Sequence, residues 1–217
     1  MTQRATEPEQ IQAAVRAERL AVADLVEGLD DAGWSVRSLC PAWTVREVVA
    51  HLTVTTRATL PSVIGDAIRA RGSFDRMTVD VAHRRAAAFS PAELVQQLRE
   101  SAQSSHRMPL SGPMDPLMDV VVHAQDIARP LGRRHVTPPD VVVQVLRYLA
   151  ENRLMGGPRR VAGLQLVATD AEWSTGEGPE VRGALSDLLL TVAGRPAGLA
   201  HLTGPGVDGL TGRLAAA

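Results

Sequence analysis

The sequence of 217 residues contains a single cysteine, Cys40, and no lysine. One cysteine excludes a disulfide within the chain and a multi-cysteine zinc site. The 23 basic and 24 acidic residues leave a net charge of −1. The chain therefore has no excess of positive charge, and we expect no nucleic-acid partner. No apolar run approaches the roughly 18 residues that a membrane span requires, so we expect no membrane partner either.

The composition is that of an ordinary globular protein, with 45% hydrophobic and 22% charged residues. Residues 1–4 lead into a polar stretch without the apolar region of a signal peptide, which predicts a cytoplasmic protein. All basic residues are arginine, and alanine, valine and glycine are abundant. This bias is typical of a GC-rich genome and favours an actinobacterial source.

Most of the chain is predicted to be helical, because apolar residues recur at helical spacing between clear start and stop signals. Thr44 and Glu47 have the spacing of a capping box, and Pro61 is expected to kink or interrupt the helix that follows. The predicted helices cover residues 7–29, 45–71, 75–89, 91–106, 116–129 and 138–155.

The pattern changes at residues 156–158, a Gly-Gly-Pro break. Beyond it we predict strands at 161–169, near 173–174 and at 179–182, a short helix at 184–193 and a loop-rich tail. The sequence thus predicts a mainly α fold in two domains, a helical bundle at 1–157 and a small α+β domain at 158–217. The second domain is near the lower size limit for independent folding.

Three residues from two predicted helices can form a metal site. Asp119 and His123 are four residues apart, so they lie on one helix face, where they can hold one ion or simply hydrogen-bond to each other. His51 lies on the apolar face of the second predicted helix. If the two helices face each other, His51, Asp119 and His123 form a set of two histidines and one carboxylate, which suits a divalent metal with an open position.

Other candidates have less support from the sequence. Cys40 has no neighbouring base in the sequence and is expected to be a small buried residue before a helix. Arg182 and Arg195 lie in the C-terminal part, where either can meet an anionic ligand. The remaining histidines are expected at the surface: His83, His106, His135 and His201.

The segment CPAWTVREVVAHL at 40–52 resembles the signature of the mycothiol-dependent maleylpyruvate isomerase family. VVHAQDI at 121–127, with RPLG behind it, is similar to a second signature, and GALSDLLL at 183–190 resembles the small sterol-carrier-like C-terminal domain. The resemblance covers nearly the whole chain. It implies a DinB-like four-helix bundle followed by a small α+β C-terminal domain.

The resemblance also implies a function. His51, Asp119 and His123 match the family's metal ligands, although the family has glutamate where this chain has Asp119, and Ala42 replaces a more usual glycine. Aspartate is one methylene shorter, so it binds a metal from a closer helix approach. The implied cofactors are a divalent metal, most often zinc, and mycothiol or a similar thiol as cosubstrate.

The implied chemistry is thiol activation, because a cation with an open position favours the deprotonated thiol. The thiolate then isomerises an electrophilic double bond or displaces a leaving group, giving an isomerase or an S-transferase. Asp126 is expected to orient a ligand histidine, and Arg182 or Arg195 to hold a substrate carboxylate. The protein is expected to be a monomer or homodimer.

Two other functions remain open from the sequence. One is a non-catalytic DinB-like protein that binds a metal or another ligand in a stress or detoxification response. The other is an iron oxygenase, because two histidines and one carboxylate also bind ferrous iron. Such oxygenase sites are usually built on β-barrels, whereas these ligands lie on predicted helices.

Overall fold

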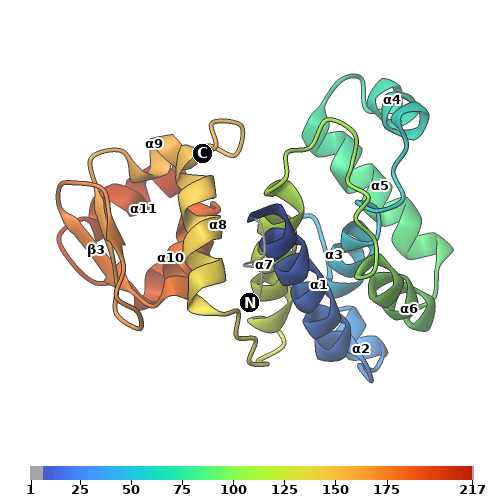
Figure 1. Cartoon of the computed structure of the whole chain (residues 1–217), viewed down its shortest axis with the longest axis horizontal. Coiled ribbons are helices and arrows are strands. Elements are labelled where there is room, and N and C mark those ends of the chain that lie inside the picture. The colour runs from blue at the N-terminus through green and yellow to red at the C-terminus, as the bar shows by residue number, and fades with distance from the viewer. Residues whose placement is uncertain (1–6, 217) are drawn as a thin grey trace, which may run out of the picture. The chain divides into compact units, whose positions relative to one another are not determined.

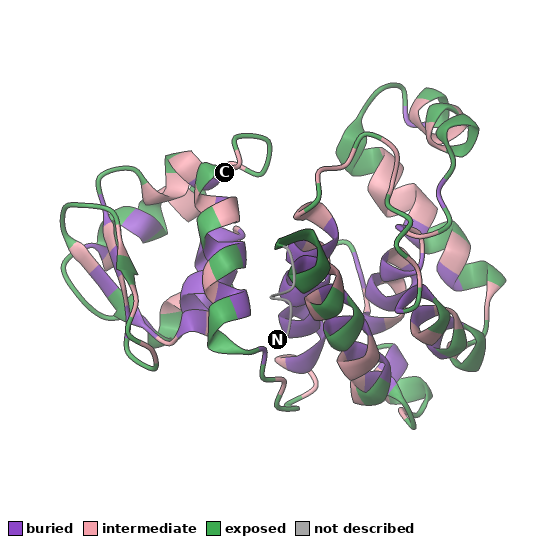
Figure 2. Cartoon of the chain, in the orientation of Figure 1, coloured by how far each residue is buried: buried purple, intermediate pink, exposed green. Residues whose placement is uncertain are grey.

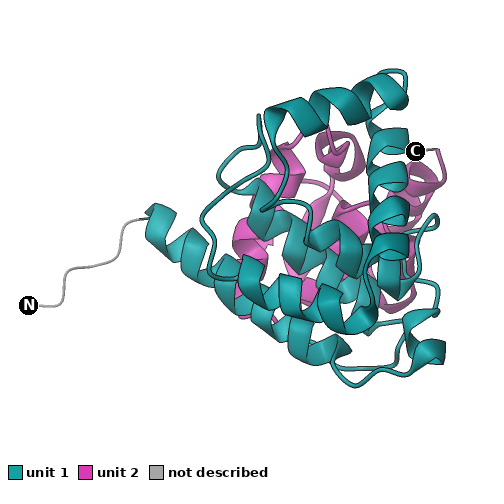
Figure 3. Ribbon diagram, turned by 90° about the vertical axis from the view of Figure 1, so that its right-hand side faces the viewer, with its two compact units in different colours: residues 1–135 teal, residues 136–217 magenta. Residues whose placement is uncertain are grey.

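The computed structural model describes residues 7–216. They divide into two compact units: unit 1 ends at His135 and unit 2 begins at Val136 (Figure 3). No helix in this part of the chain has the length and hydrophobicity needed to cross a membrane. The division precedes the boundary predicted near residue 157, because the helix after Val136 packs against the C-terminal elements.

All the named elements in the described residues of unit 1 are helices, joined by loops (Figure 1). Its helices are α1 (Glu7–Val26), α2 (Asp31–Trp34), α3 (Val45–Leu52), α4 (Leu60–Arg69), α5 (Phe74–Ala88), α6 (Pro91–Ser101) and α7 (Asp115–Ala128). Helix α1 packs against α6 and α7, and α3 packs against α5, α6 and α7. The helices α1, α3, α6 and α7 therefore enclose the core of this unit.

Helix α7 is the centre of unit 1. From Pro116 to Ala128 every residue except Asp119 is buried (Figure 2). The run Val120–Val122 explains this position, because a helix that is apolar on all sides must be covered on all sides. A polar side chain on α7 therefore lies among apolar neighbours, where an ionised group needs a partner.

Local signals account for where α3 begins. The predicted capping box is present: the Thr44 amide donates to Glu47 Oε2 at 2.6 Å, and the Thr44 hydroxyl contacts the same oxygen. The helix predicted at 45–71 is interrupted, as expected from Pro61: α3 ends at Leu52, and α4 begins at Leu60 with Pro61 in its first turn. Proline suits a first turn, where its missing N–H has no helical acceptor.

Unit 2 combines helices with a small sheet. Its elements are α8 (Pro139–Glu151), α9 (Gly157–Val161), β1 (Gln165–Ala168), β2 (Ser174–Thr175), β3 (Glu180–Gly183), α10 (Leu185–Val192), the 3₁₀ helix η1 (Pro196–His201) and α11 (Val207–Ala215). The strand order is β2-β1-β3, with β1 antiparallel to β2 and parallel to β3. In the β1–β3 pair, Leu166 faces Val181 in register, and both are buried.

Two expectations about unit 2 are wrong. The strand predicted at 161–169 begins only at Gln165, because residues 157–161 form α9. The tail, expected to be loop-rich because of its glycines, contains α11. Leu210 of α11 is fully buried, and the burial of this face offsets the low helix propensity of Gly209 and Gly212.

Candidate metal centre

Helices α3 and α7 bring the three candidate ligands together. His51 lies in the last turn of α3, and its Nε2 is 3.1 Å from Asp119 Oδ1. One turn further along α7, His123 Nε2 is 3.4 Å from the same oxygen. One donor atom from each of the three residues lies within 4.8 Å of the others. Both imidazoles therefore approach one carboxylate oxygen.

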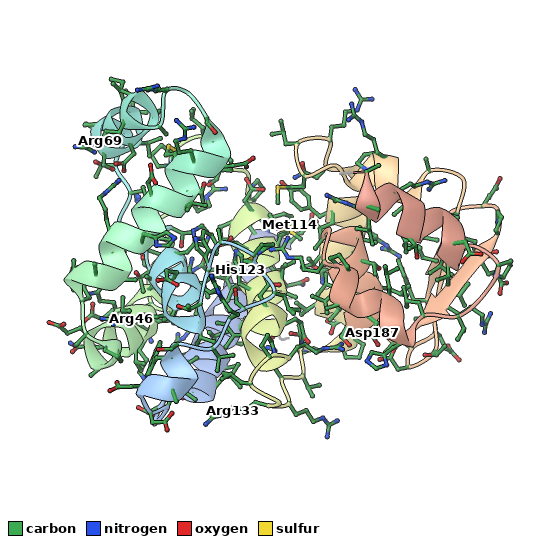
Figure 4. The ribbon with its side chains drawn as sticks, turned by 180° about the vertical axis from the view of Figure 1, so that it is seen from behind. Arg46, Arg69, Met114, His123, Arg133 and Asp187 are labelled. Atoms are coloured by element: carbon green, nitrogen blue, oxygen red, sulfur yellow. The ribbon has the colours of Figure 1, made fainter. Side chains whose placement is uncertain are left out.

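The cluster is mostly buried. Figure 4 shows His123 in the interior of unit 1, and its side chain is 9% exposed. The Asp119 side chain is 20% exposed, against 12% for His51. Asp119 is thus the part of the cluster that solvent reaches most, and it is also the one interruption in the buried surface of α7.

The electrostatics follow from this burial and pairing. Burial alone would raise the pKa of Asp119, but its attraction to His51 and hydrogen bonds to both imidazoles hold that pKa far below its usual range. Burial would likewise lower the pKa of His123, yet its contacts with Asp119, Asp126 and Cys40 raise it well above the usual value. Asp119 is therefore ionised at neutral pH and available as an anionic ligand.

A buried arginine adds a positive charge to this environment. Arg19 on α1 is 3% exposed, and its guanidinium donates to the Ser101 carbonyl at 2.8 Å and to Thr55 Oγ1 at 3.2 Å. Burial lowers the pKa of Arg19, and the attraction of Asp119 opposes that shift. Arg19 thus helps to keep Asp119 ionised.

A second layer of polar groups lies on the other side of the His123 ring. Asp126 is fully buried, and its Oδ2 is 2.8 Å from His123 Nδ1. The Cys40 thiol donates to the same Oδ2 at 3.1 Å, and its sulfur is 3.8 Å from His123 Nδ1. Cys40, His123 and Asp126 also meet the spacing for metal ligation. Cys40 was expected to be a small buried apolar residue, and this expectation is wrong, because Cys40 is only partly buried and its thiol contacts two polar side chains.

Trp43 forms an aromatic wall beside the cluster. Its ring centroid lies 4.9 Å from that of His51 and 5.7 Å from that of His123, and the two imidazole centroids are 5.0 Å apart. Trp43 is 6% exposed. An indole in this position excludes water and limits how the imidazole rings can turn.

The donor set fits a divalent cation. Two imidazole nitrogens and one carboxylate oxygen are ordinary zinc ligands, and three protein ligands leave a position open. Tetrahedral zinc, with ligand distances of about 2.0–2.1 Å, places its ligand atoms about 3.3 Å apart. The spacings of 3.1 and 3.4 Å around Asp119 Oδ1 are close to this value. Two of the three distances between the candidate ligand atoms therefore fit tetrahedral zinc, and all three atoms lie within 4.8 Å of one another.

Arg182 and Arg195 belong to unit 2. Arg182 is exposed on β3, and its Nη1 bonds to Glu180 Oε2 at 2.9 Å. Arg195 precedes η1, and its Nη1 donates to the Ala193 carbonyl at 2.7 Å. The expectation that one of them binds a substrate carboxylate stays a prediction.

The other histidines lie outside the cluster. His83, His106 and His201 are exposed, as expected. The surface expectation is wrong for His135, whose side chain is 5% exposed and whose Nε2 is 2.8 Å from Glu18 Oε2. The partner lies on α1, far away in the sequence, so no local pattern around His135 revealed it.

The comparisons with known proteins agree with this architecture. The profile of the mycothiol maleylpyruvate isomerase N-terminal domain matches residues 15–115. This range includes His51, whereas Asp119 and His123 lie just beyond it. The comparison with curated proteins gave no match.

Two solved structures have a similar fold. One is a crystal structure of the mycothiol-dependent maleylpyruvate isomerase, at 18% identity and a TM-score of 0.58, covering 92% of this chain and 93% of that one. The other is a histidine-to-alanine mutant of such an isomerase, at 18% identity and a TM-score of 0.57, with the same coverage. The fold class predicted from the sequence, a mainly helical DinB-like unit followed by a small α+β unit, is confirmed.

Proposed function

We propose that this chain is a divalent-metal-dependent enzyme that uses a low-molecular-weight thiol, such as mycothiol, to isomerise an electrophilic double bond of the maleylpyruvate type. The observation that carries the proposal is the convergence of His51, Asp119 and His123 from α3 and α7. Zinc is the proposed metal, because it takes this donor set and retains an open position. The domain family of residues 15–115 and the fold of the solved isomerases support the choice of thiol and reaction.

The metal, when bound, supplies a positive charge that favours the thiolate form of a thiol ligand at neutral pH. The side chains prepare this site in distinct ways. Asp119 offers an oxygen that is already ionised. Asp126 engages His123 Nδ1 and so leaves Nε2, on the Asp119 side, for ligation. Trp43 covers the imidazole rings and excludes water from them.

A thiolate that adds to an activated double bond converts it to a single bond, which permits rotation before the thiolate leaves again. The thiol is regenerated, so the net change is cis–trans isomerisation. Displacement of a leaving group by the same thiolate would instead give an S-transferase.

The test is an isomerisation assay on the full-length protein with maleylpyruvate as substrate, with and without zinc and mycothiol. We expect activity only when both are present, and we expect His123→Ala to remove both activity and bound zinc. His83→Ala is the matched control, since that histidine is half exposed and lies outside the cluster. Full zinc retention by His123→Ala would contradict the ligand assignment.

Thermal unfolding separates this function from the non-catalytic alternative. A ligand that binds the folded state raises the apparent stability by RT ln(1 + [L]/Kd), about 2.7 kcal/mol at a hundred times Kd. We expect zinc to stabilise the protein and mycothiol to add a further shift only when zinc is present. Stabilisation by zinc without any effect of mycothiol would support a metal-binding protein that lacks this activity.

A further inference from the structure

We propose that Cys40 is a positioning residue of the metal centre, which holds the Asp126 carboxylate so that Asp126 can orient His123. This inference rests on the proposed metal function and extends it to a residue beyond the three ligands. It starts from one oxygen, Asp126 Oδ2, which is 2.8 Å from His123 Nδ1 and accepts from the Cys40 thiol at 3.1 Å.

The Asp126 carboxylate is deeply buried, so its orientation depends on the protein groups around it. Asp126 has no exposed surface. A buried carboxylate is costly unless donors satisfy its oxygens, and a donor at one fixed position also restricts the rotation of the group. The thiol of Cys40 supplies such a donor from outside α7. Without it, Oδ2 would lose one of the contacts that hold it against the imidazole.

The backbone fixes Cys40 in this place. The Leu39 amide donates to the Asp126 carbonyl at 3.1 Å, so the turn before α3 is joined to the same residue through both main chain and side chain. Within the turn, the Cys40 amide donates to Ser38 Oγ at 3.1 Å, and the Trp43 amide donates to the Cys40 carbonyl at 3.0 Å. The turn therefore delivers the thiol to a preset position.

The same turn also presents Trp43, whose ring packs on both imidazoles. Each side of His123 thus has a separate partner: the Nδ1 side meets Asp126 and Cys40, and the Nε2 side meets Asp119. A histidine that donates from Nδ1 has its Nε2 lone pair available for a metal. The thiol therefore holds the carboxylate, and the carboxylate holds Nδ1 so that Nε2 is directed towards Asp119.

The test is a Co²⁺ titration of the full-length protein, followed through the visible ligand-field bands of the bound ion. Replacing the group that hydrogen-bonds a metal-bound histidine usually weakens metal affinity by about 10- to 100-fold. Cys40 acts on His123 through Asp126, so we expect Cys40→Ala to fall at the lower end of this range, about 10-fold. Cys40→Ser retains a donor and should recover most of the loss. The ligand-field bands should shift in Cys40→Ala and return towards the wild-type position in Cys40→Ser.

Leu39→Ala is the matched control. It removes an apolar side chain from the same turn but keeps the backbone hydrogen bond from residue 39 to Asp126. We expect its Co²⁺ affinity and spectrum to equal those of the wild type. Thermal unfolding of each metal-free variant shows whether it is folded. Equal spectra and affinities in Cys40→Ala and the wild type would overturn the inference.

Three outcomes of the titration lead to different conclusions. A thiolate-to-cobalt charge-transfer band in the wild type that disappears in Cys40→Ser would make Cys40 a ligand, which overturns its role as a positioning residue. No Co²⁺ binding by the wild type would contradict the proposed metal function and this inference together. Normal binding by the wild type with no effect of Cys40→Ala would overturn only the inference.

Discussion

The buried pair between Glu18 and His135 gives a stability prediction that does not depend on any metal. Glu18 lies on α1, which packs against α7, and the two side chains are each 5% exposed with 2.8 Å between Oε2 and Nε2. Replacing Glu18 with alanine removes the carboxylate and leaves the imidazole buried without it. Removing one partner of a buried hydrogen bond costs about 1–3 kcal/mol, so we expect the free energy of unfolding to fall by about that amount.

Urea denaturation followed by tryptophan fluorescence measures this change. Trp34 and Trp43 report on unit 1, and Trp173→Phe in all variants removes the fluorescence of unit 2. Asp24→Ala is the matched control on the same helix, because Asp24 forms an exposed pair with Arg99. We expect this control to change stability very little. If Glu18→Ala lowered the free energy of unfolding no more than Asp24→Ala does, the argument that the buried Glu18–His135 pair stabilises the fold would be contradicted.

Three further predictions concern the site and the helix that carries His51. Asp119→Asn should abolish zinc binding in a calorimetric titration, whereas Asp119→Glu, which keeps the carboxylate, should retain it more weakly. A chelator should lower the thermal midpoint of zinc-loaded protein but leave that of His51→Ala unchanged. Burial raises the pKa of Glu47, but hydrogen bonds from Thr44 bring it below its ordinary value of 4.5. The carboxylate therefore stabilises the fold above that value, and the stability is lost as the pH falls through the lowered pKa. Glu47→Gln keeps an acceptor for Thr44 but loses the negative charge at the helix N-terminus, so it should cost about 0.3–1 kcal/mol at pH 7 in urea denaturation, and the difference from wild type should shrink in acid.

Local signals in the sequence predicted the features of the fold that depend on neighbouring residues. Thr44 with Glu47 and Ser90 with Glu93 form capping boxes because both partners lie within one helical turn, so the starts of α3 and α6 follow from the sequence. The tail was missed for the opposite reason. The propensity of its glycines is local, whereas the burial of Leu210, which favours α11, depends on packing against other elements.

The candidate site divides in the same way. Asp119 and His123 share a helix face by spacing alone, but their approach to His51 requires α3 and α7 to pack together, and the resemblance of the two signatures supplied that expectation. Cys40 and His135 were misjudged because their partners, Asp126 and Glu18, lie 86 and 117 residues away. When the partner of a polar side chain is distant in the sequence, the local sequence pattern does not reveal that partner.

X-ray absorption at the zinc edge tests most directly whether His51, Asp119 and His123 together hold the ion. For the full-length protein loaded with one equivalent of zinc, we expect nitrogen and oxygen neighbours at about 2.0–2.1 Å and the outer-shell scattering of two imidazole rings. A sulfur neighbour at about 2.3 Å would place the ion at Cys40 instead and contradict the assignment. Scattering from fewer than two imidazoles would contradict it equally.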